Sequence, residues 1–416
     1  MTHDSPNLEF RLGRLRFIRL PPTNVLLSLD KTQSETAAFD IGVGITDDYG
    51  ADIELFQSID LRLEVFAASS SRGGAKIGLK LASDDSRSST FSPSLDFTFS
   101  PLRGPFHGLS IKLTVPSTKT VWPTSVRFRL SVAPQEATND SSRALESTAT
   151  TRIRQIIGEE DQGVLETWND LRYVFLAVET GDVELVRKLP TSNPPVKVQT
   201  THRRITVPSR SPITIVERPG LNNSTGQRLW DCAIGLSAFF SLHPEALQDC
   251  YTPVENSADR LAQLHNYSDG ESSVVATDIE ATVETTLSEN LSHNEANAKV
   301  ARRVLNWGTL SDSHVKDMLD CSASVSHSSV PSDLTLIASD VLYDPDTHQL
   351  LLDTLLSFLR PSPSVAPLFT DISTRALIAY KRRTDGDDGF FALAKEAGLN
   401  VGKIWEWSEV SVWSFA

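Results

Sequence analysis

The stretch Leu334-Thr-Leu-Ile-Ala-Ser-Asp-Val-Leu-Tyr343 decides the fold class of this chain. Its first six residues are mostly apolar, which is typical of a short strand buried in a sheet. Asp340 and Tyr343 follow, and Asp344-Pro345 ends the strand because proline has no N–H to donate. Residues 347–359 then have the spacing of an amphipathic helix. Ligands of open α/β sheets lie beyond the carboxyl ends of the strands, so this segment predicts the place of a binding site.

The same alternation of strand and helix extends over the C-terminal half of the chain. We predict strands at 212–216, 273–277, 300–305, 334–339 and 375–380, and helices at 230–242, 280–293, 347–359 and 389–398. Residues 401–415 fit two antiparallel strands. Such alternation favours a mostly parallel sheet with helices on both faces, and an antiparallel hairpin is a common edge for it.

The first third of the chain has a different pattern. Apolar and polar residues alternate at 15–20, 61–66, 76–81, 109–115 and 126–132, and clusters of Ser, Gly, Pro and Asp separate these segments. A period of two indicates antiparallel strands with one wet face, arranged as a small sandwich or barrel. We therefore expect an α/β fold in which a small antiparallel β domain precedes the mostly parallel sheet.

Three parts follow from these patterns. Residues 1–135 are predicted to form the β-rich N-terminal domain, and residues 201–416 the α/β domain. Between them, 136–200 is expected to be a polar linker with a helical segment. The helices are predicted at 163–178, where apolar residues recur at helical spacing, and at 183–189.

The composition excludes several classes of function. A formal charge of -14 argues against broad binding to nucleic acids or anionic membranes, which depends on clustered Lys and Arg. The three cysteines are odd in number and have no zinc-like spacing, so we expect reduced thiols and no metal. We expect no signal peptide, because the first residues have no basic start and no apolar core, and no apolar run is long enough to predict a membrane span. We expect a monomer located in the cytoplasm or the nucleus.

Four motifs point to one family. They are Thr225-Gly-Gln-Arg-Leu-Trp-Asp-Cys-Ala233, Ala276-Thr-Asp-Ile-Glu280, Leu305-Asn-Trp-Gly308 and Ser339-Asp-Val-Leu-Tyr343. In this order they resemble the seven-strand S-adenosylmethionine-dependent methyltransferases, and more narrowly the protein-lysine methyltransferases of the methyltransferase-like 21 and 22 type. The resemblance covers roughly residues 213–416 and implies a Rossmann-like seven-strand sheet. The β-rich N-terminal part lies outside the family's catalytic core.

The resemblance implies S-adenosylmethionine as the cofactor and assigns residues to it. Asp278, at a strand end, would accept both ribose hydroxyls, with Ile279 beside it. Trp230 and Trp307 would offer flat apolar walls, and Ser339 would lie at the next strand end. The alternatives are that Asp278 is an ordinary helix cap and that the two tryptophans are ordinary core residues.

The resemblance also implies a lysine of a protein substrate as the methyl acceptor, with Asp340 and Tyr343 shaping its entrance. The target amine must lose a proton, and its usual pKa is about 10.4. Desolvation lowers that pKa, while a carboxylate and a phenol can position the amine. The alternative is a helix start with a surface acid at Asp340.

One expected part of the family pattern is missing. A glycine-rich loop should follow a first strand between the helix at 230–242 and Asp278, but residues 248–272 contain one glycine, Gly270, and no apolar strand. Either the chain is a degenerate methyltransferase that serves as an interaction or scaffold protein, or the sequence lacks a glycine-rich exon. Asp40-Ile-Gly-Val-Gly-Ile-Thr46 looks similar to such a loop, but we interpret it as a glycine pair in a strand.

A short basic patch, Lys381-Arg-Arg383, follows the strand predicted at 375–380. We expect it to be a solvated loop, because a run of charges usually lies in solvent. A nuclear signal or a substrate contact is the alternative interpretation.

Overall fold

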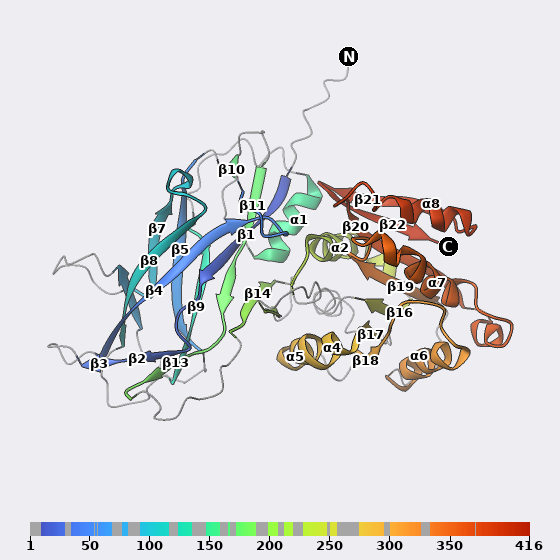
Figure 1. Ribbon diagram of the computed structural model, residues 1–416, viewed down its shortest axis with the longest axis horizontal. Helices are drawn as coiled ribbons and strands as arrows, with labels where there is room; N and C mark the ends of the chain where they lie inside the picture. Colours follow the sequence, from blue (N-terminus) through green and yellow to red (C-terminus); the bar gives the residue numbers. More distant parts are fainter. Residues whose placement is uncertain are drawn as a thin grey trace, which may run out of the picture. The chain divides into compact units, whose positions relative to one another are not determined.

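The structure is a computed structural model, and it divides into two compact units. The N-terminal unit comprises residues 1–146, 159–204 and 217–221, and the C-terminal unit comprises 147–158, 205–216 and 222–416. The predicted mixed α/β class with several sheets is confirmed (Figure 1). The structure describes residues 10–29, 35–53, 55, 57–68, 77–81, 92–115, 124–134, 147–158, 165–166, 172–188, 199–206, 212–218, 228–247, 250–255, 274–294, 300–325, 333–370 and 372–416.

The C-terminal unit contains a seven-stranded sheet in the order β18-β17-β16-β19-β20-β22-β21. Its strands are β16 (Cys250–Glu255), β17 (Val274–Asp278), β18 (Val300–Val304), β19 (Asp333–Ser339), β20 (Ser373–Lys381), β21 (Val401–Trp407) and β22 (Val410–Phe415). The first five pair in parallel, and β22 pairs antiparallel with both β20 and β21. The predicted hairpin at the end of the chain is confirmed.

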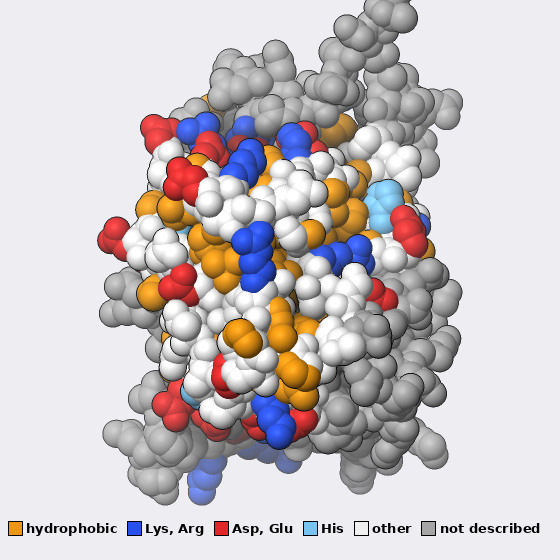
Figure 2. All heavy atoms as spheres, turned by 90° about the vertical axis from the view of Figure 1, so that its right-hand side faces the viewer, with side chains coloured by type: hydrophobic (Ala, Val, Ile, Leu, Met, Phe, Trp, Pro, Cys, Tyr) orange, Lys and Arg blue, Asp and Glu red, His pale blue; other side chains and the backbone are white. Residues whose placement is uncertain are grey.

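Helices cover both faces of this sheet, as the side chains of β20 show. Ala376 and Ile378 belong to a core with α7 (His348–Leu359) and α8 (Gly389–Glu396), whereas Leu377 and Ala379 belong to a core with α2 (Asp231–Leu242). Successive residues of a strand point to opposite faces, so β20 is buried on both sides. Figure 2 shows hydrophobic side chains gathered at the middle of one face of this unit, with Lys and Arg among them.

Three further helical segments belong to the C-terminal unit. The segment predicted at 280–293 consists of α4 (Glu280–Thr282), a π-helical turn at Val283–Leu287 and α5 (Ser288–His293). The other two, α1 (Thr148–Ile157) and α6 (Asp312–Val325), were not predicted from the sequence. Among the described residues, none of the helices combines the length and the apolar character that crossing a bilayer requires.

The expectation that no strand leads into the segment before Asp278 is wrong. β16 lies at the centre of the sheet, where Thr252–Glu255 pairs with Val274–Thr277 of β17 and the strand also pairs with β19. Pro253 lies within it and cannot donate to a neighbour, which is why the sequence does not look like a central strand. Parallel neighbours on both sides nevertheless hold it there. The remaining residues of 248–272, where the glycine loop was expected, lie outside the described ranges.

Two asparagines, Asn290 of α5 and Asn294 at its C-cap, hold the short strand β15 (Ile213–Glu217). Asn290 Oδ1 accepts the N–H of Val216 at 2.7 Å, and Asn294 exchanges hydrogen bonds with the N–H and the carbonyl of Thr214, both at 2.7 Å. The side chain of Asn294 thus completes a strand-like pair with the backbone of β15. These two asparagines therefore have a structural role.

The N-terminal unit consists of two sheets. One has the order β10-β11-β1-β4-β8-β6 with β3 paired to β4, and the other contains β14-β12-β9-β13-β2 with β5 on β9 and β7 on β5. The strands are β1 (Phe10–Arg19), β2 (Asn24–Leu26), β3 (Ser28–Leu29), β4 (Glu35–Thr46), β5 (Ile59–Ala67), β6 (Gly78–Leu81), β7 (Ser94–Phe99), β8 (Phe106–Val115), β9 (Ser125–Val132), β10 (Leu165–Glu166), β11 (Arg172–Leu176), β12 (Val178–Thr180), β13 (Val183–Val186) and β14 (Thr201–Ile205). The glycine pair at 42 and 44 lies within β4, as predicted.

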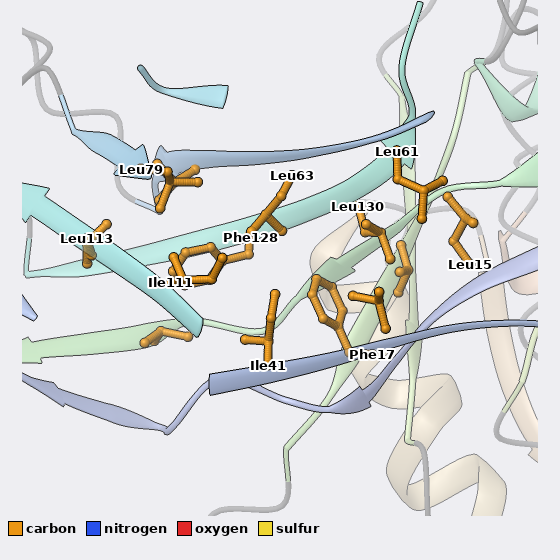
Figure 3. Close-up of a cluster of buried hydrophobic side chains, with 14 of the residues drawn as sticks. Leu15, Phe17, Ile41, Leu61, Leu63, Leu79, Ile111, Leu113, Phe128 and Leu130 are labelled. Atoms are coloured by element: carbon orange, nitrogen blue, oxygen red, sulfur yellow. The ribbon is translucent and has the colours of Figure 1, made fainter. Parts of the chain in front are cut away.

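The two sheets of this unit share one hydrophobic core. Ile41 and Leu113 come from one sheet, Leu63 and Phe128 from the other, and all are almost completely buried (Figure 3). Alternate residues of each strand supply this core, because side chains alternate across a sheet. The period of two in the sequence therefore indicated which side chains point inwards.

The helices predicted at 163–178 and 183–189 are wrong in the described residues, which form strands β10 to β13 instead. Residues 173–180 are buried without interruption. A continuous apolar run fits helical spacing as well as a buried strand, so periodicity alone misleads here. At Ala177 the chain passes from β11, which pairs with β1, to β12, which pairs with β9.

A buried arginine fixes this passage. Arg203 Nη1 donates to the carbonyls of Leu15, Leu176 and Ala177 at 2.8–3.0 Å, and its Nε donates to Glu217 at 2.9 Å. Its side chain is 2% exposed. One guanidinium thus satisfies carbonyls where the strand leaves one sheet for the other, a place where ladder partners are lost.

Candidate active site

The carboxyl ends of the parallel strands bring the predicted site residues to one edge of the C-terminal sheet. β17 ends at Asp278, β19 ends at Ser339 and is followed by Asp340, and β20 ends at Lys381. The order of the strands reverses at β16, which has β17 on one side and β19 on the other. Open α/β sheets bind their ligands at such a switch point, so this edge is the candidate site.

Asp278 lies at the β17 end with its carboxylate half-buried. Its Oδ1 accepts the N–H of Ile279 at 2.7 Å, and Leu305 N–H donates to its backbone carbonyl at 2.9 Å. Burial raises the pKa of Asp278 to about 6, while hydrogen bonds from Ile279 and Thr282 oppose the shift. Ile279 itself is exposed. A strand-end carboxylate that titrates near pH 6 can accept two ligand hydroxyls when it is ionised.

Trp307 reaches the same edge from β18. It packs partly buried against the core beneath α7. Gly308 follows with a φ of 140°, which favours glycine, and it is held to α7 by hydrogen bonds with the Thr354 hydroxyl at 2.9 and 3.2 Å. The turn after β18 therefore fixes the indole in place.

Asp340 is committed to an ion pair. Its φ of 59° is unusual for a residue other than glycine, and its carboxylate accepts from Arg383 Nε at 2.8 Å and from Arg383 Nη2. Both side chains are buried. Burial raises the pKa of Asp340, and Arg383 opposes this shift. Ser339, directly before it, is fully buried in β19.

Trp230 joins this pair from the start of α2. It occupies the N-cap position of that helix, and the guanidinium carbon of Arg383 lies 4.6 Å from its ring centroid. This distance is within the range of a cation–π contact. Tyr343, by contrast, is 44% exposed at the rim. The structure thus brings Trp230 and Asp340 together through Arg383.

A second buried cation lies next to this group. Lys381 Nζ lies 3.1 Å from Asp231 and 3.2 Å from Glu409, and the Lys381 and Asp231 side chains are less than 10% exposed. The expectation of a solvated loop at 381–383 is therefore wrong for Lys381 and Arg383, although Arg382 is exposed. These cations are buried because each has an anionic partner.

Sequence reasoning placed Lys381 and Arg383 in a solvated loop and gave Asp231 and Glu409 no role at the site. The available signal was the position of the basic residues directly after a buried strand, where the carboxyl end of the sheet must lie. Their acidic partners come from other elements, and spacing along one sequence cannot identify such pairs.

Residues 209–397 match a known family, described as lysine methyltransferase. The chain carries a lysine methyltransferase domain. A comparison with curated proteins gives no match.

Solved structures similar to this chain include two titled as methyltransferases and one titled as a fibrillarin. The METTL16 methyltransferase domain is 8% identical, covering 45% of this chain and 69% of that one, with a TM-score of 0.29. A Pyrococcus furiosus methyltransferase is 10% identical, covering 43% and 80%, at 0.27. Aeropyrum pernix fibrillarin, with S-adenosyl-L-methionine bound, is 10% identical, covering 52% and 94%, at 0.27. At such TM-scores these similarities add nothing to the family match.

The cofactor of the lysine methyltransferase domain is S-adenosylmethionine, and the described residues fit it. Asp278 offers a strand-end carboxylate next to the exposed side chain of Ile279. Trp230 and Trp307 offer indole rings at the same edge of the sheet, held by the start of α2 and by the turn after β18. The family also implies a protein substrate that carries a lysine.

Proposed function

We propose that this chain is a protein-lysine N-methyltransferase whose site lies at the carboxyl edge of the C-terminal sheet. The observation that carries the proposal is the strand order β18-β17-β16-β19-β20-β22-β21, with a single strand, β22, antiparallel to its neighbours β20 and β21. This order supports the assignment of the sheet as a Rossmann-like seven-strand methyltransferase sheet. It also accounts for Asp278, Ser339 and Asp340 lying at strand ends.

The cofactor side of the site is formed by the end of β17 and its neighbours. Asp278 accepts the ribose hydroxyls, Ile279 lines the same subsite, and Trp230, Trp307 and Ser339 form its walls. When bound, S-adenosylmethionine supplies an electrophilic methyl group that passes to the lysine nitrogen. The π-helical turn after Asp278 supports a ligand role for this segment, because such turns are frequent at functional sites.

The acceptor side is formed by Asp340 and Tyr343. Because Arg383 already neutralises Asp340, we assign Asp340 to shaping the entrance rather than to removing a proton. Tyr343, exposed at the rim, positions the amine. Desolvation among the surrounding side chains lowers the pKa of the amine, so the proton leaves to solvent before the nitrogen attacks.

The remaining proposals concern partners and organisation. The substrate is a protein rather than a nucleic acid, given the formal charge of -14, and the chain acts as a monomer in the cytoplasm or the nucleus without membrane attachment. We propose domain boundaries near 135 and 200, with 201–416 as the catalytic domain. The described part of 165–188 contributes strands rather than helices.

Transfer of an isotopic methyl group tests this function. The full chain is incubated with S-adenosylmethionine carrying a deuterated methyl group and with a cell protein extract, and lysine methylation is read by mass spectrometry. We expect heavy methyl groups on lysine with the wild type, strong loss with Asp278→Asn, and a reduced rate with Tyr343→Phe. A wild-type sample no different from one without the chain would contradict the proposal.

A second candidate function is binding without catalysis, as an interaction or scaffold protein. It is favoured by the residues after β16, since no glycine occurs between Gly235 and Gly270. A backbone that approaches a cofactor closely usually needs glycine at that place. This role predicts that Asp278→Ala leaves the cellular role of the protein unchanged, whereas catalysis predicts its loss.

A further inference from the structure

Arg383 links three elements at the candidate site. Its side chain, 6% exposed, extends from the end of β20, holds both carboxylate oxygens of Asp340 after β19, and lies 4.6 Å from the Trp230 ring at the start of α2. A bidentate arginine–carboxylate pair fixes the direction of both groups. The guanidinium therefore sets where the carboxylate and the indole lie relative to each other.

The backbone of Arg383 is itself held by a buried acid. Asp387, which is fully buried, accepts the N–H of Arg383 at 2.7 Å and the N–H of Thr384 at 3.1 Å. Gly386 lies against Pro345, where an added Cβ would come within 2.8 Å of the ring. The loop that carries Arg383 thus packs on the chain just after Tyr343. The loop 383–388 therefore holds Asp340 and packs on Pro345, two residues after Tyr343.

Arg383 is the cation that pairs directly with Asp340, whereas the two basic residues before it pair with other acids. Lys381 lies between Asp231 and Glu409. Arg382 points to solvent and pairs with Asp385 and Asp388. Loss of the Arg383 charge would leave the buried carboxylate of Asp340 without its bidentate partner, and such a carboxylate takes up a proton or moves towards water.

We propose that Arg383 is the positioning residue of the acceptor site, which holds Asp340 and the Trp230 indole in the arrangement that methyl transfer needs. This inference rests on the proposed function. It adds to it a residue that acts through Asp340 and Trp230 rather than on the amine. A guanidinium suits this task because its planar fork grips a carboxylate while its face stacks on an aromatic ring.

The test compares Arg383→Gln, Arg383→Lys and the matched control Arg382→Gln. We expect Arg383→Gln to lower kcat/KM for methyl transfer about 100-fold, mostly through kcat, because a misplaced reacting group costs that order of rate. Arg383→Lys should recover part of the rate, since it keeps the charge but not the fork. Arg382→Gln should match the wild type. The double variant Asp340→Asn/Arg383→Gln, which removes the uncompensated charge, separates misplacement from misfolding.

Two results would overturn the inference. One is an increase in kcat/KM with Arg383→Gln, which would mean that the guanidinium blocks the amine subsite. The other is a rate within twofold of the wild type. If the wild type transfers no methyl group, the proposed function fails, and the emission of Trp230 still decides the positioning role. The emission of Trp230 is taken as the difference between the spectra of the wild type and of Trp230→Phe. It should shift in Arg383→Gln and not in Arg382→Gln. The absence of a shift in Arg383→Gln would refute the positioning role.

Discussion

Arg383 donates to both carboxylate oxygens of Asp340, through Nε at 2.8 Å and through Nη2, although the two residues lie at the ends of different strands. Their side chains are 6% and 5% exposed. A buried pair of this kind contributes little net stability but is costly to break, because one charge is left without its partner. Asp340, the acid of the Ser339–Tyr343 motif, therefore lies inside the protein and holds Arg383 in place.

Breaking this pair should destabilise the C-terminal unit. We expect Asp340→Asn to lower the free energy of unfolding by about 3–5 kcal/mol, because it breaks the buried ion pair with Arg383. Asp385→Asn, which loses a solvent-exposed pair with Arg382, should cost less than about 1 kcal/mol. Urea unfolding of both variants measures the difference. Equal midpoints for the two would show that the Asp340 pair is not buried as described.

Asp278 should make stability depend on pH. Its pKa of about 6 in the folded chain lies above the usual 3.8, so the unfolded state ionises first as pH rises. Stability from the protonated form is complete below pH 3.8, falls between 3.8 and 6, and is absent above 6. Asp278→Asn removes this loss, so it should unfold at a higher temperature than wild type at pH 8.

The comparison needs a second pH and an exposed carboxyl as control. Below pH 3.8 the advantage of Asp278→Asn should vanish, because the wild-type carboxyl is then protonated in both states. Glu284→Gln, an exposed position on the same helical segment, should not show this change with pH. An advantage of Asp278→Asn that is the same at both pH values would contradict the burial of this acid.

Arg203 should be a main determinant of stability in the N-terminal unit. Arg203→Met breaks the buried ion pair with Glu217 and removes the donor to three carbonyls, so we expect a loss of about 3–5 kcal/mol. Arg62→Ala removes a bidentate but exposed pair with Asp96 and should cost less than about 1 kcal/mol. Similar losses in calorimetric unfolding would show that burial does not distinguish the two arginines.

Gly235 should tolerate no added methyl group. A Cβ there would lie 2.7 Å from Val410 Cγ1, so α2 would have to move away from β22. Gly235→Ala is expected to cost about 1–3 kcal/mol. Val410→Ala should make room for this methyl group. The double variant should therefore lose less unfolding free energy than the sum of the losses of the two single variants. Strict additivity in urea unfolding would exclude close contact between these positions.

Strong local patterns made most of the C-terminal elements predictable. Residues 334–339 are an uninterrupted buried strand, and the apolar spacing at 347–359 matches α7 closely. The same reasoning missed α6, although Val315 and Met318 are both buried at helical spacing, because many other residues of that helix are polar. Amphipathic patterns with few apolar residues are easily lost among loops.

Other features depend on tertiary pairing that a single sequence does not contain. β16 carries Pro253 and is a central strand only because β17 and β19 flank it. The run 173–180 fits helix and strand alike, and its pairing with β1 and β9 decides for strand. At the site, Asp340 was found from its motif, but its partner Arg383 lies 43 residues away. The acid's role therefore changes once its partner is known.

Titration calorimetry of the full chain with S-adenosylmethionine tests the central claim most directly. At pH 8 we expect saturable binding at one site per chain, weakened at least tenfold by Asp278→Asn. Below pH 6 the wild-type affinity should fall about tenfold per pH unit, because only the ionised carboxylate accepts the ribose hydroxyls, and Asp278→Asn should lack this dependence. Absence of binding by the folded wild type at millimolar cofactor would contradict the claim.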